Sequence, residues 1–414
     1  MVGGLAKFWE RAGPAGRWGG LLLLTVAVLW WRRPDQFSHP YIWVEEGSYT
    51  LKAYAASGLA SVVEPVSGYF VLAAKLIALT AFRLSIAWAP EIDTALTVLF
   101  TVAVAGAVAL APTHLRGRPW CAVWLLVLPL ESEVYAVSEY AFWWAGVLLV
   151  LALLWDSTRG GAGWRAVFLL LGGLSSPIIA ALAPLFALRA LLERGRSEIG
   201  AAALAAALAI AQTIAVFTVE GERPTYLGQI GPRAMLGKFV GYLYVSGFAP
   251  YDMQVGRAAI IGGLLIAGLG IAAWMARARI DRMFGLLLLA WLALCFASVV
   301  RAPLAGIHPL AGGPRYFFYP FLLLGWATLW IAAESPSRWV RWALGAMLAS
   351  SVWVAYPHMP RHHHRVDWRA ELAACAAAPG SYSLPIHQDG RKETIVAVEF
   401  TGAECRALMA MSWF

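Results

Sequence analysis

The stretch LLLLTVAVLWWRRPDQFSHPYIWVEEGSYTLKAYAASGL, residues 21–59, combines the two features that decide the fold. It begins inside an apolar run that predicts a first membrane-spanning helix. It then continues into a polar loop with two adjacent carboxylates, Glu45 and Glu46. A basic N-terminus precedes the run and no small-residue cleavage site follows it, so we expect an uncleaved first helix rather than a signal peptide.

The composition of the whole chain predicts an all-α polytopic membrane protein. Of its 414 residues 60% are hydrophobic and 14% are charged, and 21 Trp and 14 Tyr fit aromatic belts at two membrane interfaces. The net charge of +8 comes from Arg residues scattered between apolar runs, so we expect membrane lipids and no nucleic acid as partners. About 11 spans are predicted, at 18–31, 92–112, 119–130, 140–155, 166–175, 177–192, 199–218, 258–276, 283–300, 316–333 and 342–356.

The charge between these spans predicts their orientation. Lys and Arg are denser in one alternate set of connecting segments than in the other, which places the N-terminus in the cytoplasm and the C-terminus outside the plasma (inner) membrane. This solution requires residues 66–82 to re-enter the membrane or lie along it without crossing. The first outside loop then covers residues 32–91 and contains amphipathic helices.

The C-terminal tail predicts a small extracytoplasmic α+β domain, 357–414, after the transmembrane domain, 1–356. Its DWRAELAACAAA segment begins like a helix, whereas SYSLPI and ETIVAVEF alternate like strands. Cys375 and Cys405 either form a disulfide, which an extracytoplasmic location permits, or remain two free thiols.

Glu45 and Glu46 are the first candidates for chemistry. Adjacent carboxylates repel each other, which raises the pKa of one that is partly buried, and such a group can take a proton from a hydroxyl. A solvated pair in an ordinary loop is the alternative. His39 would complete a site for a divalent cation such as Mg²⁺ or Mn²⁺, although a lone His without a spaced partner is weak evidence. The RHHHR run, 361–365, is interpreted as a solvated juxtamembrane turn.

The layout of residues 18–356 resembles the GT-C superfamily of integral-membrane glycosyltransferases, which use polyprenyl- or dolichyl-phosphate sugars. The resemblance rests on the EEG motif before an amphipathic helix, on LPLESEVYAVSEYAFWW (128–144), and on GGLSSPIIAALAPLFALRAL (172–191). It implies that a first-loop glutamate is the catalytic base. It also implies that Glu131 or Glu133 of the second outside loop orients the acceptor or the donor sugar.

Arg315 lies in GPRYFFYP, at the mouth of a predicted span, and is the candidate ligand of the donor phosphate. A guanidinium binds phosphate bidentately, and the resemblance implies a basic residue near this place. A snorkelling interfacial Arg is the alternative. Tyr316 stands beside it, Lys238 is a weaker phosphate candidate, and His308 would assist in orienting the substrates.

These features together predict a bacterial glycosyltransferase of cell-envelope glycans. It would move a hexosyl or pentosyl group from a polyprenyl-phosphate sugar to a hydroxyl of a glycan, lipid or protein acceptor, with inversion. One alternative is a transporter or flippase of lipid-linked saccharides, which should carry charged residues inside its spans. The other is a glycan polymerase or ligase, which should carry several outside arginines.

Overall fold

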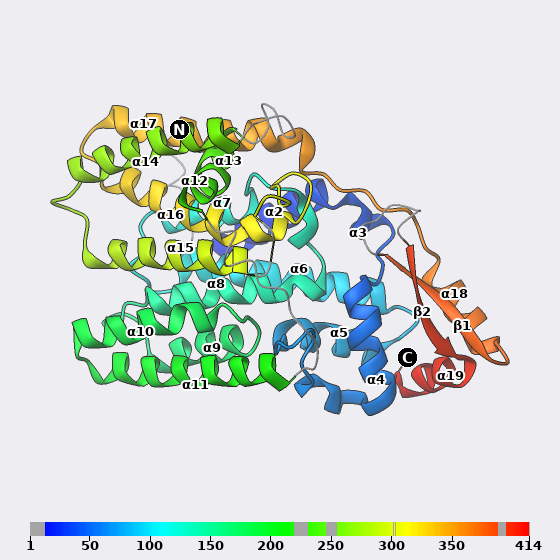
Figure 1. The fold of residues 1–414 in the computed structure, drawn as a ribbon. Coiled ribbons are helices and arrows are strands. Elements are labelled where there is room, and N and C mark those ends of the chain that lie inside the picture. Colours follow the sequence, from blue (N-terminus) through cyan, green and yellow to red (C-terminus); the bar gives the residue numbers. More distant parts are fainter. Residues whose placement is uncertain are drawn as a thin grey trace.

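The computed structural model describes residues 13–218, 231–245, 255–300, 302, 304–387 and 395–413. Within them the chain is mostly helical, as predicted, and the long helices lie alongside one another (Figure 1). The first half contains α2 (Pro14–Arg32), α3 (Pro34–Ser38), the π-helix η1 (Glu46–Leu51), α4 (Lys52–Ser57), η2 (Gly58–Val63), α5 (Leu72–Leu84), α6 (Ala89–Leu110), α7 (Arg118–Leu126), η3 (Ser132–Val134), η4 (Ser138–Tyr140), α8 (Ala141–Leu153), α9 (Ala162–Gly173), α10 (Ile179–Glu193) and α11 (Arg196–Thr218). The second half contains α12 (Pro232–Leu236), the π-helix η6 (Gly237–Gly241), α13 (Tyr242–Val245), α14 (Val255–Met275), α15 (Arg282–Val300), η7 (Pro314–Phe317), α16 (Phe318–Glu334), α17 (Arg338–Ala355), η8 (Tyr356–His358), α18 (Trp368–Ala377), β1 (Ser381–His387), β2 (Ile395–Thr401) and α19 (Gly402–Met411).

Each predicted span coincides with one helix, and 5 helices of the described residues are long and apolar enough to cross a membrane. These are α6, α11, α14, α15 and α16 with its preceding turn. Helix α7 has 9 residues and α9 has 12. At 1.5 Å per residue both are shorter than about 20 Å, whereas a hydrocarbon core is about 30 Å thick. Crossing by the remaining predicted spans stays a prediction.

Helix α8 lies in the interior because it is apolar on every side. All its residues except Phe142 are buried, which is the behaviour expected of a helix without a polar face. Gly146 permits a close approach here, since a Cβ at this position would lie 2.0 Å from the Tyr319 hydroxyl of α16. That hydroxyl donates a hydrogen bond to the Trp143 carbonyl at 2.8 Å. The packing of α8 therefore fixes the start of α16 next to the start of α8.

The first loop folds into short helices rather than a span. Helix α5 has 13 residues, or about 20 Å, which agrees with the expectation that residues 66–82 do not cross. Lys75 of α5 is buried, and its Nζ donates to the Ser61 carbonyl at 2.5 Å. The loop is therefore a compact cap at one end of the helical body, as Figure 1 shows for α4 and α5.

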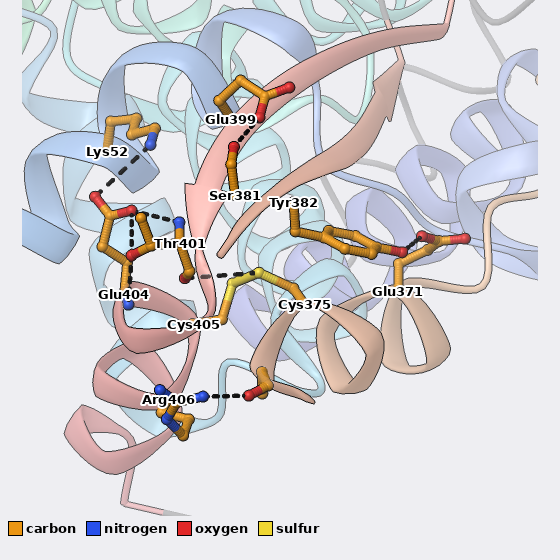
Figure 2. The surroundings of a disulfide bond; sticks show 11 residues. Lys52, Glu371, Cys375, Ser381, Tyr382, Glu399, Thr401, Glu404, Cys405 and Arg406 are labelled. Carbon is orange, nitrogen blue, oxygen red and sulfur yellow. Dashed lines mark hydrogen bonds and ion pairs between the residues drawn. A yellow bond between two sulfur atoms is a disulfide. The ribbon is translucent and has the colours of Figure 1, made fainter. Parts of the chain in front are cut away.

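The C-terminal residues form the predicted small α+β unit, in the order α18, β1, β2 and α19. The strands pair antiparallel, from Ser381 opposite Thr401 to His387 opposite Ile395. A disulfide joins Cys375 to Cys405 with a Cα–Cα distance of 6.0 Å, so α18 is tied to α19 (Figure 2). Closing this loop stabilises the fold by about 3–4 kcal/mol in the chain-entropy model.

This C-terminal unit packs on the first loop and shares a hydrophobic core with it. Trp368 is buried in that core and donates a hydrogen bond to the Ile86 carbonyl at 2.8 Å. At the rim, Lys52 of α4 lies 3.8 Å from Glu404 of α19, as Figure 2 shows. The shared core is made by residues Ile42, Leu51, Tyr54, Phe82, Leu372, Leu384, Ile386 and Phe400, with others of both segments. The unit therefore covers the loop that carries the two adjacent glutamates.

Candidate active site

The two adjacent glutamates differ in burial and surroundings. Glu46 is 1% exposed, and its Oε2 accepts a hydrogen bond from the Trp43 backbone N–H at 3.5 Å. Glu45 is half-buried. Successive residues of a helix point about 100° apart, so a single turn aims the two carboxylates in different directions. The turn that begins at Glu46 is π-helical, a conformation common at functional sites.

Gly47, the third residue of the EEG motif, is required by the C-terminal unit. A Cβ at this position would lie 2.1 Å from Cδ1 of Ile386 in β1. Immediately before the motif, Trp43 forms an isolated parallel bridge with His387. Strand β1 therefore lies directly against the motif, and the glycine leaves room for the Ile386 side chain.

Glu46 lies near two other buried acids, Asp93 in the first turns of α6 and Glu139 in η4. Its pKa is raised well above the ordinary value, first by burial and then by repulsion from Asp93 and Glu139. Burial also raises the pKa of Glu139 to about 8, with a further contribution from the charge of Glu45, while Lys75 opposes the shift. At neutral pH Glu139 therefore holds its proton, and burial favours the protonated form of Glu46 as well.

Glu45 lies near enough to Glu133 and Arg315 for the charges of both to act on its carboxyl group. Burial is the largest cause of the raised pKa of Glu45, and repulsion from Glu133 adds to it, while the Arg315 guanidinium lowers it. A half-buried carboxylate with a raised pKa has the proton affinity that a general base needs.

Glu133, Arg315 and Tyr140 form a bonded group beside Glu45. The Nη1 of Arg315 donates to Glu133 Oε1 and, at 3.3 Å, to the Tyr140 hydroxyl, which itself donates to Glu133 Oε1 at 2.9 Å. The Arg315 guanidinium carbon lies 5.2 Å from the centre of the Tyr316 ring. The predicted phosphate ligand therefore rests against a predicted orienting residue. A guanidinium has five N–H donors, so these contacts leave it able to bind an anion as well.

Glu131 occupies the neighbouring position and has a different arginine partner. Arg361 Nη1 donates to Glu131 Oε2 at 3.2 Å, and the Glu131 backbone N–H donates to the Pro309 carbonyl at 2.8 Å. Burial raises the pKa of Glu131, and Arg361 opposes that shift. Each of the two glutamates of the ESE segment thus pairs with an arginine from a later part of the chain.

Lys238 of η6 and His308 of the loop before η7 form a second group. Lys238 is buried, and its Nζ donates to the Ile307 carbonyl at 2.7 Å. Burial and the charge of Lys238 lower the pKa of His308 to about 4, so His308 is neutral at physiological pH. The His308 ring lies 5.2 Å from that of Tyr242. These contacts organise the loop that leads to Arg315, and the predicted roles of Lys238 in phosphate binding and of His308 in orientation stay predictions.

The histidines near the site do not follow the sequence interpretation. His39 is not placed with Glu45 and Glu46, because its Nδ1 contacts Ser38 Oγ and its Nε2 contacts the His363 carbonyl, both at 2.8 Å. Within the described ranges, no group of three or more His, Cys, Asp or Glu side chains is arranged to hold a metal ion.

The RHHHR run is not a solvated turn throughout, which corrects that interpretation. His363 is 6% exposed and its Nδ1 lies 3.3 Å from Oδ2 of the buried Asp35. Arg361 Nε donates to His363 Nε2 at 2.9 Å. The run lies in the linker that joins α17 to the C-terminal unit. Arg361 of this linker contacts Glu131 of the second loop, and His363 contacts Asp35 of the first loop.

Sequence reasoning missed two buried arginines that shape the second loop. Arg32 is fully buried and donates to the carbonyls of Leu128 at 3.0 Å and Leu130 at 2.5 Å. Arg33 donates to the Tyr135 carbonyl at 2.6 Å and pairs with Asp35. Two adjacent arginines after a span were an available signal, but they also fit a topology signal. These bonds hold the segment that carries Glu131 and Glu133.

Comparisons with protein-family models, with curated proteins and with solved structures return no match for this chain. A functional conclusion therefore depends on the geometry of Glu45, Glu133 and Arg315 and on the quoted motifs.

Proposed function

We propose that this protein is a membrane glycosyltransferase that moves a sugar from a polyprenyl-phosphate donor to a hydroxyl group of an extracytoplasmic acceptor. The observation that supports it best is the half-buried Glu45 carboxylate facing the Glu133–Arg315 pair. A base and an anion-binding guanidinium side by side are the two groups that this transfer needs.

Glu45 is the base in this proposal, and Glu46 is not. Glu46 is almost fully buried and lies near other acids, which raise its pKa, so its carboxyl group is out of reach of an acceptor. Glu45 takes the proton of the acceptor hydroxyl as the oxygen attacks the anomeric carbon. The bond from that carbon to the phosphate oxygen breaks, and polyprenyl phosphate leaves with the bonding electrons. A single displacement inverts the anomeric configuration.

Arg315 stabilises the leaving phosphate. Its side chain is 32% exposed while that of Glu133 is 9% exposed, so the cation is accessible and its partner is held in the interior. In the proposal, Glu133 fixes the guanidinium and the phosphate binds on the open side. Charge that develops on the phosphate oxygen is then met by a preorganised donor.

An apolar cavity fits the lipid part of such a donor. It has a volume of about 240 Å³, lies between α14, α15 and α16, and is lined by side chains that include Leu269, Trp291 and Leu324. Leu324 lies nine residues after Arg315 along nearly continuous helix, or about 14 Å at 1.5 Å per residue. An isoprenoid chain with its phosphate at Arg315 can therefore reach the cavity along α16.

A second candidate function is a proton-coupled carrier of lipid-linked saccharides. The buried carboxyl groups of Glu46, Asp93 and Glu139 favour it, because ionisable groups in such positions mark proton pathways. A carrier moves labelled lipid between leaflets without consuming it, whereas a transferase breaks the sugar–phosphate bond.

The test is transfer of radiolabelled sugar from a panel of polyprenyl-phosphate sugars in reconstituted vesicles. We expect Glu45→Gln to lose about a hundredfold or more of the turnover, the contribution of a general base. Glu46→Gln is the matched control and should retain most of it. Equal losses in both variants would contradict the assignment of the base. Movement of intact donor between leaflets with no transfer would replace the proposal by the carrier.

A further inference from the structure

His363 belongs to the linker after α17 and is buried between the first loop and β1. Its side chain has no exposed surface, and neither has that of Asp35, whose Oδ2 lies 3.3 Å from His363 Nδ1. The other ring nitrogen contacts Arg361 of the same linker. A titratable ring enclosed in this way alters its contacts whenever it gains a proton.

The contact with Arg361 determines which ring nitrogen of His363 holds the proton. Arg361 Nε donates to His363 Nε2 at 2.9 Å. A guanidinium has five donors and no acceptor, so Nε2 must be the acceptor and the ring proton lies on Nδ1. There it faces the Asp35 carboxylate. The hydrogen bonds therefore fit the neutral ring of His363.

A second proton on the ring would break the contact with Arg361. An imidazolium has a donor at both nitrogens and no acceptor. The new Nε2–H would point at the Nε–H of the guanidinium, and two positive groups would lie in contact. Acid therefore acts directly on the bond between these two side chains.

The charges around the ring are already balanced without that proton. Asp35 pairs with Arg33 at 3.2 Å, and Glu131 pairs with Arg361 at 3.2 Å. A protonated His363 would add a buried positive charge with no counter-ion of its own. Other titratable side chains that contact the ring or its backbone supply no carboxylate; they include Tyr41 at 3.3 Å from Nε2, His387 with its ring centre at 5.3 Å, and His39 at 2.8 Å from the His363 carbonyl.

Arg361 connects this ring to the segment that carries Glu131 and Glu133. Its Nη1 donates to Glu131 Oε2 at 3.2 Å, and the same oxygen accepts the Glu133 backbone N–H at 3.2 Å. The Glu133 carboxylate in turn pairs with Arg315. A continuous series of contacts thus runs from the His363 ring to the proposed phosphate ligand.

We infer that His363 is a pH-sensitive positioning residue that acts through Arg361 on residues 131–133. The neutral ring holds Arg361 against Glu131, and protonation in acid releases Arg361 and loosens this segment. Glu45 is not part of the series of contacts, so the release weakens binding of the donor and leaves the base in place. The effect on turnover rests on the proposed function, whereas the release of the segment does not.

The first test measures the donor KM and kcat of the full chain in vesicles from about pH 7.5 to about pH 5, where an ordinary imidazole gains its proton. His363→Gln offers an amide oxygen as acceptor for Arg361 and does not titrate. We expect the wild-type donor KM to rise about tenfold in acid, the loss of one hydrogen bond to a charged group, and that of His363→Gln to stay level. The loss of kcat that follows from protonation of Glu45 should appear in both proteins.

His362→Gln is the matched control, because His362 is the exposed neighbour of His363 in the same run. Its donor KM should follow that of wild type. A donor KM that rises equally in wild type and His363→Gln, or that stays level in His362→Gln, would overturn the inference and leave the transferase intact.

The second test needs no turnover. Hydrogen exchange of the Glu133 backbone amide, corrected for the intrinsic effect of pH, reports whether its bond to Glu131 is kept. We expect wild type to lose about tenfold of its protection at about pH 5 and His363→Gln to keep it. That result without any sugar transfer would refute the proposed function and still support the role of His363.

Two outcomes of the exchange experiment would overturn the inference. Burial raises the pKa of Glu131, so equal losses of protection in wild type and His363→Gln would assign the response to Glu131 itself. Equal protection of the wild-type amide in acid and at neutral pH would show that no release takes place, whether or not the variant folds.

Discussion

The two ends of the helical body differ in how far their buried charged groups are paired. At the end away from the C-terminal unit, Glu198 of α11 pairs with Arg165 at 2.8 Å and with Arg189 at 2.9 Å. The Arg165 Nε donates to the Ala152 carbonyl at 3.0 Å, and Arg189 Nη2 to the Trp155 carbonyl at 2.6 Å. Both arginines thereby also satisfy carbonyls at the end of α8.

At the end covered by the C-terminal unit, buried acidic side chains outnumber the cationic side chains that contact them. Glu46 and Asp93 are buried with one oxygen each that no described residue bonds. Burial of unpaired carboxyl groups costs free energy, whereas paired buried charges tie elements together. The first end therefore serves stability. The second end keeps an unfavourable arrangement, which is typical of sites retained for function.

The largest expected effect is at the end of the helical body where Glu198 pairs with Arg165 and Arg189. Glu198→Gln leaves two buried arginines with reduced compensation, and we expect a loss of about 3–5 kcal/mol in the free energy of unfolding. Thermal and denaturant unfolding of the purified protein measures it. Glu193→Gln is the matched control, because its partner Arg282 is 58% exposed, and exposed pairs contribute about 0–1 kcal/mol. A small loss in Glu198→Gln would remove the contrast between the two ends.

A smaller effect, of opposite sign, is expected at the acidic end. The pKa of Glu139 is about 8 in the folded protein against an ordinary 4.5. The folded state therefore binds its proton more tightly than the unfolded chain does, and wild-type stability decreases as pH rises from 4.5 toward 8. Glu139→Gln stays neutral, so it should be more stable than wild type by roughly 1–3 kcal/mol at alkaline pH and equal to it in acid.

The measurement is the unfolding midpoint of wild type and Glu139→Gln across the pH range. Glu91→Gln, which removes an exposed partner of Arg369, should run parallel to wild type. If the midpoints of Glu139→Gln also ran parallel to those of wild type, the buried carboxyl group of Glu139 would be charge-compensated, and the contrast between the two ends would fail.

The smallest expected effect concerns the packing of Ile386 of β1 against Gly47 of the motif. Gly47→Ala places a methyl group 2.1 Å from Cδ1 of Ile386, and we expect a loss of about 1 kcal/mol or slightly more from overpacking. Ile386→Val deletes that atom, so the double variant should be less destabilised than the sum of the two single variants. Additive losses would show that β1 does not press on the motif.

Local pattern was enough to predict the helices, the α+β C-terminal unit and the region of Glu45. Apolar runs and alternating segments depend on neighbouring residues, and each predicted span coincides with a helix. That α5 does not cross the membrane was expected from the charge pattern of the loops and stays a prediction. The membrane orientation and the number of crossing helices stay predictions.

The rest of the site depends on contacts between distant segments. Arg361 bonds Glu131 across 230 positions of the chain, and His387 bridges to Trp43 across a greater separation. No local period distinguishes the buried His363 from its exposed neighbours in RHHHR. For the same reason the local sequence could not distinguish Glu45 from Glu46, although the two differ in burial.

The linker between α17 and β1 also sets the order in which the protein can be assembled. The backbone N–H of Arg361 donates to the Arg32 carbonyl at 2.9 Å, and β1 meets the EEG motif later still in the chain. Synthesis makes the N-terminal segments first. The acidic motif is therefore translated long before the strand that packs on it, and a chain interrupted before residue 387 contains Glu45, Glu133 and Arg315 but lacks the contact between β1 and the motif.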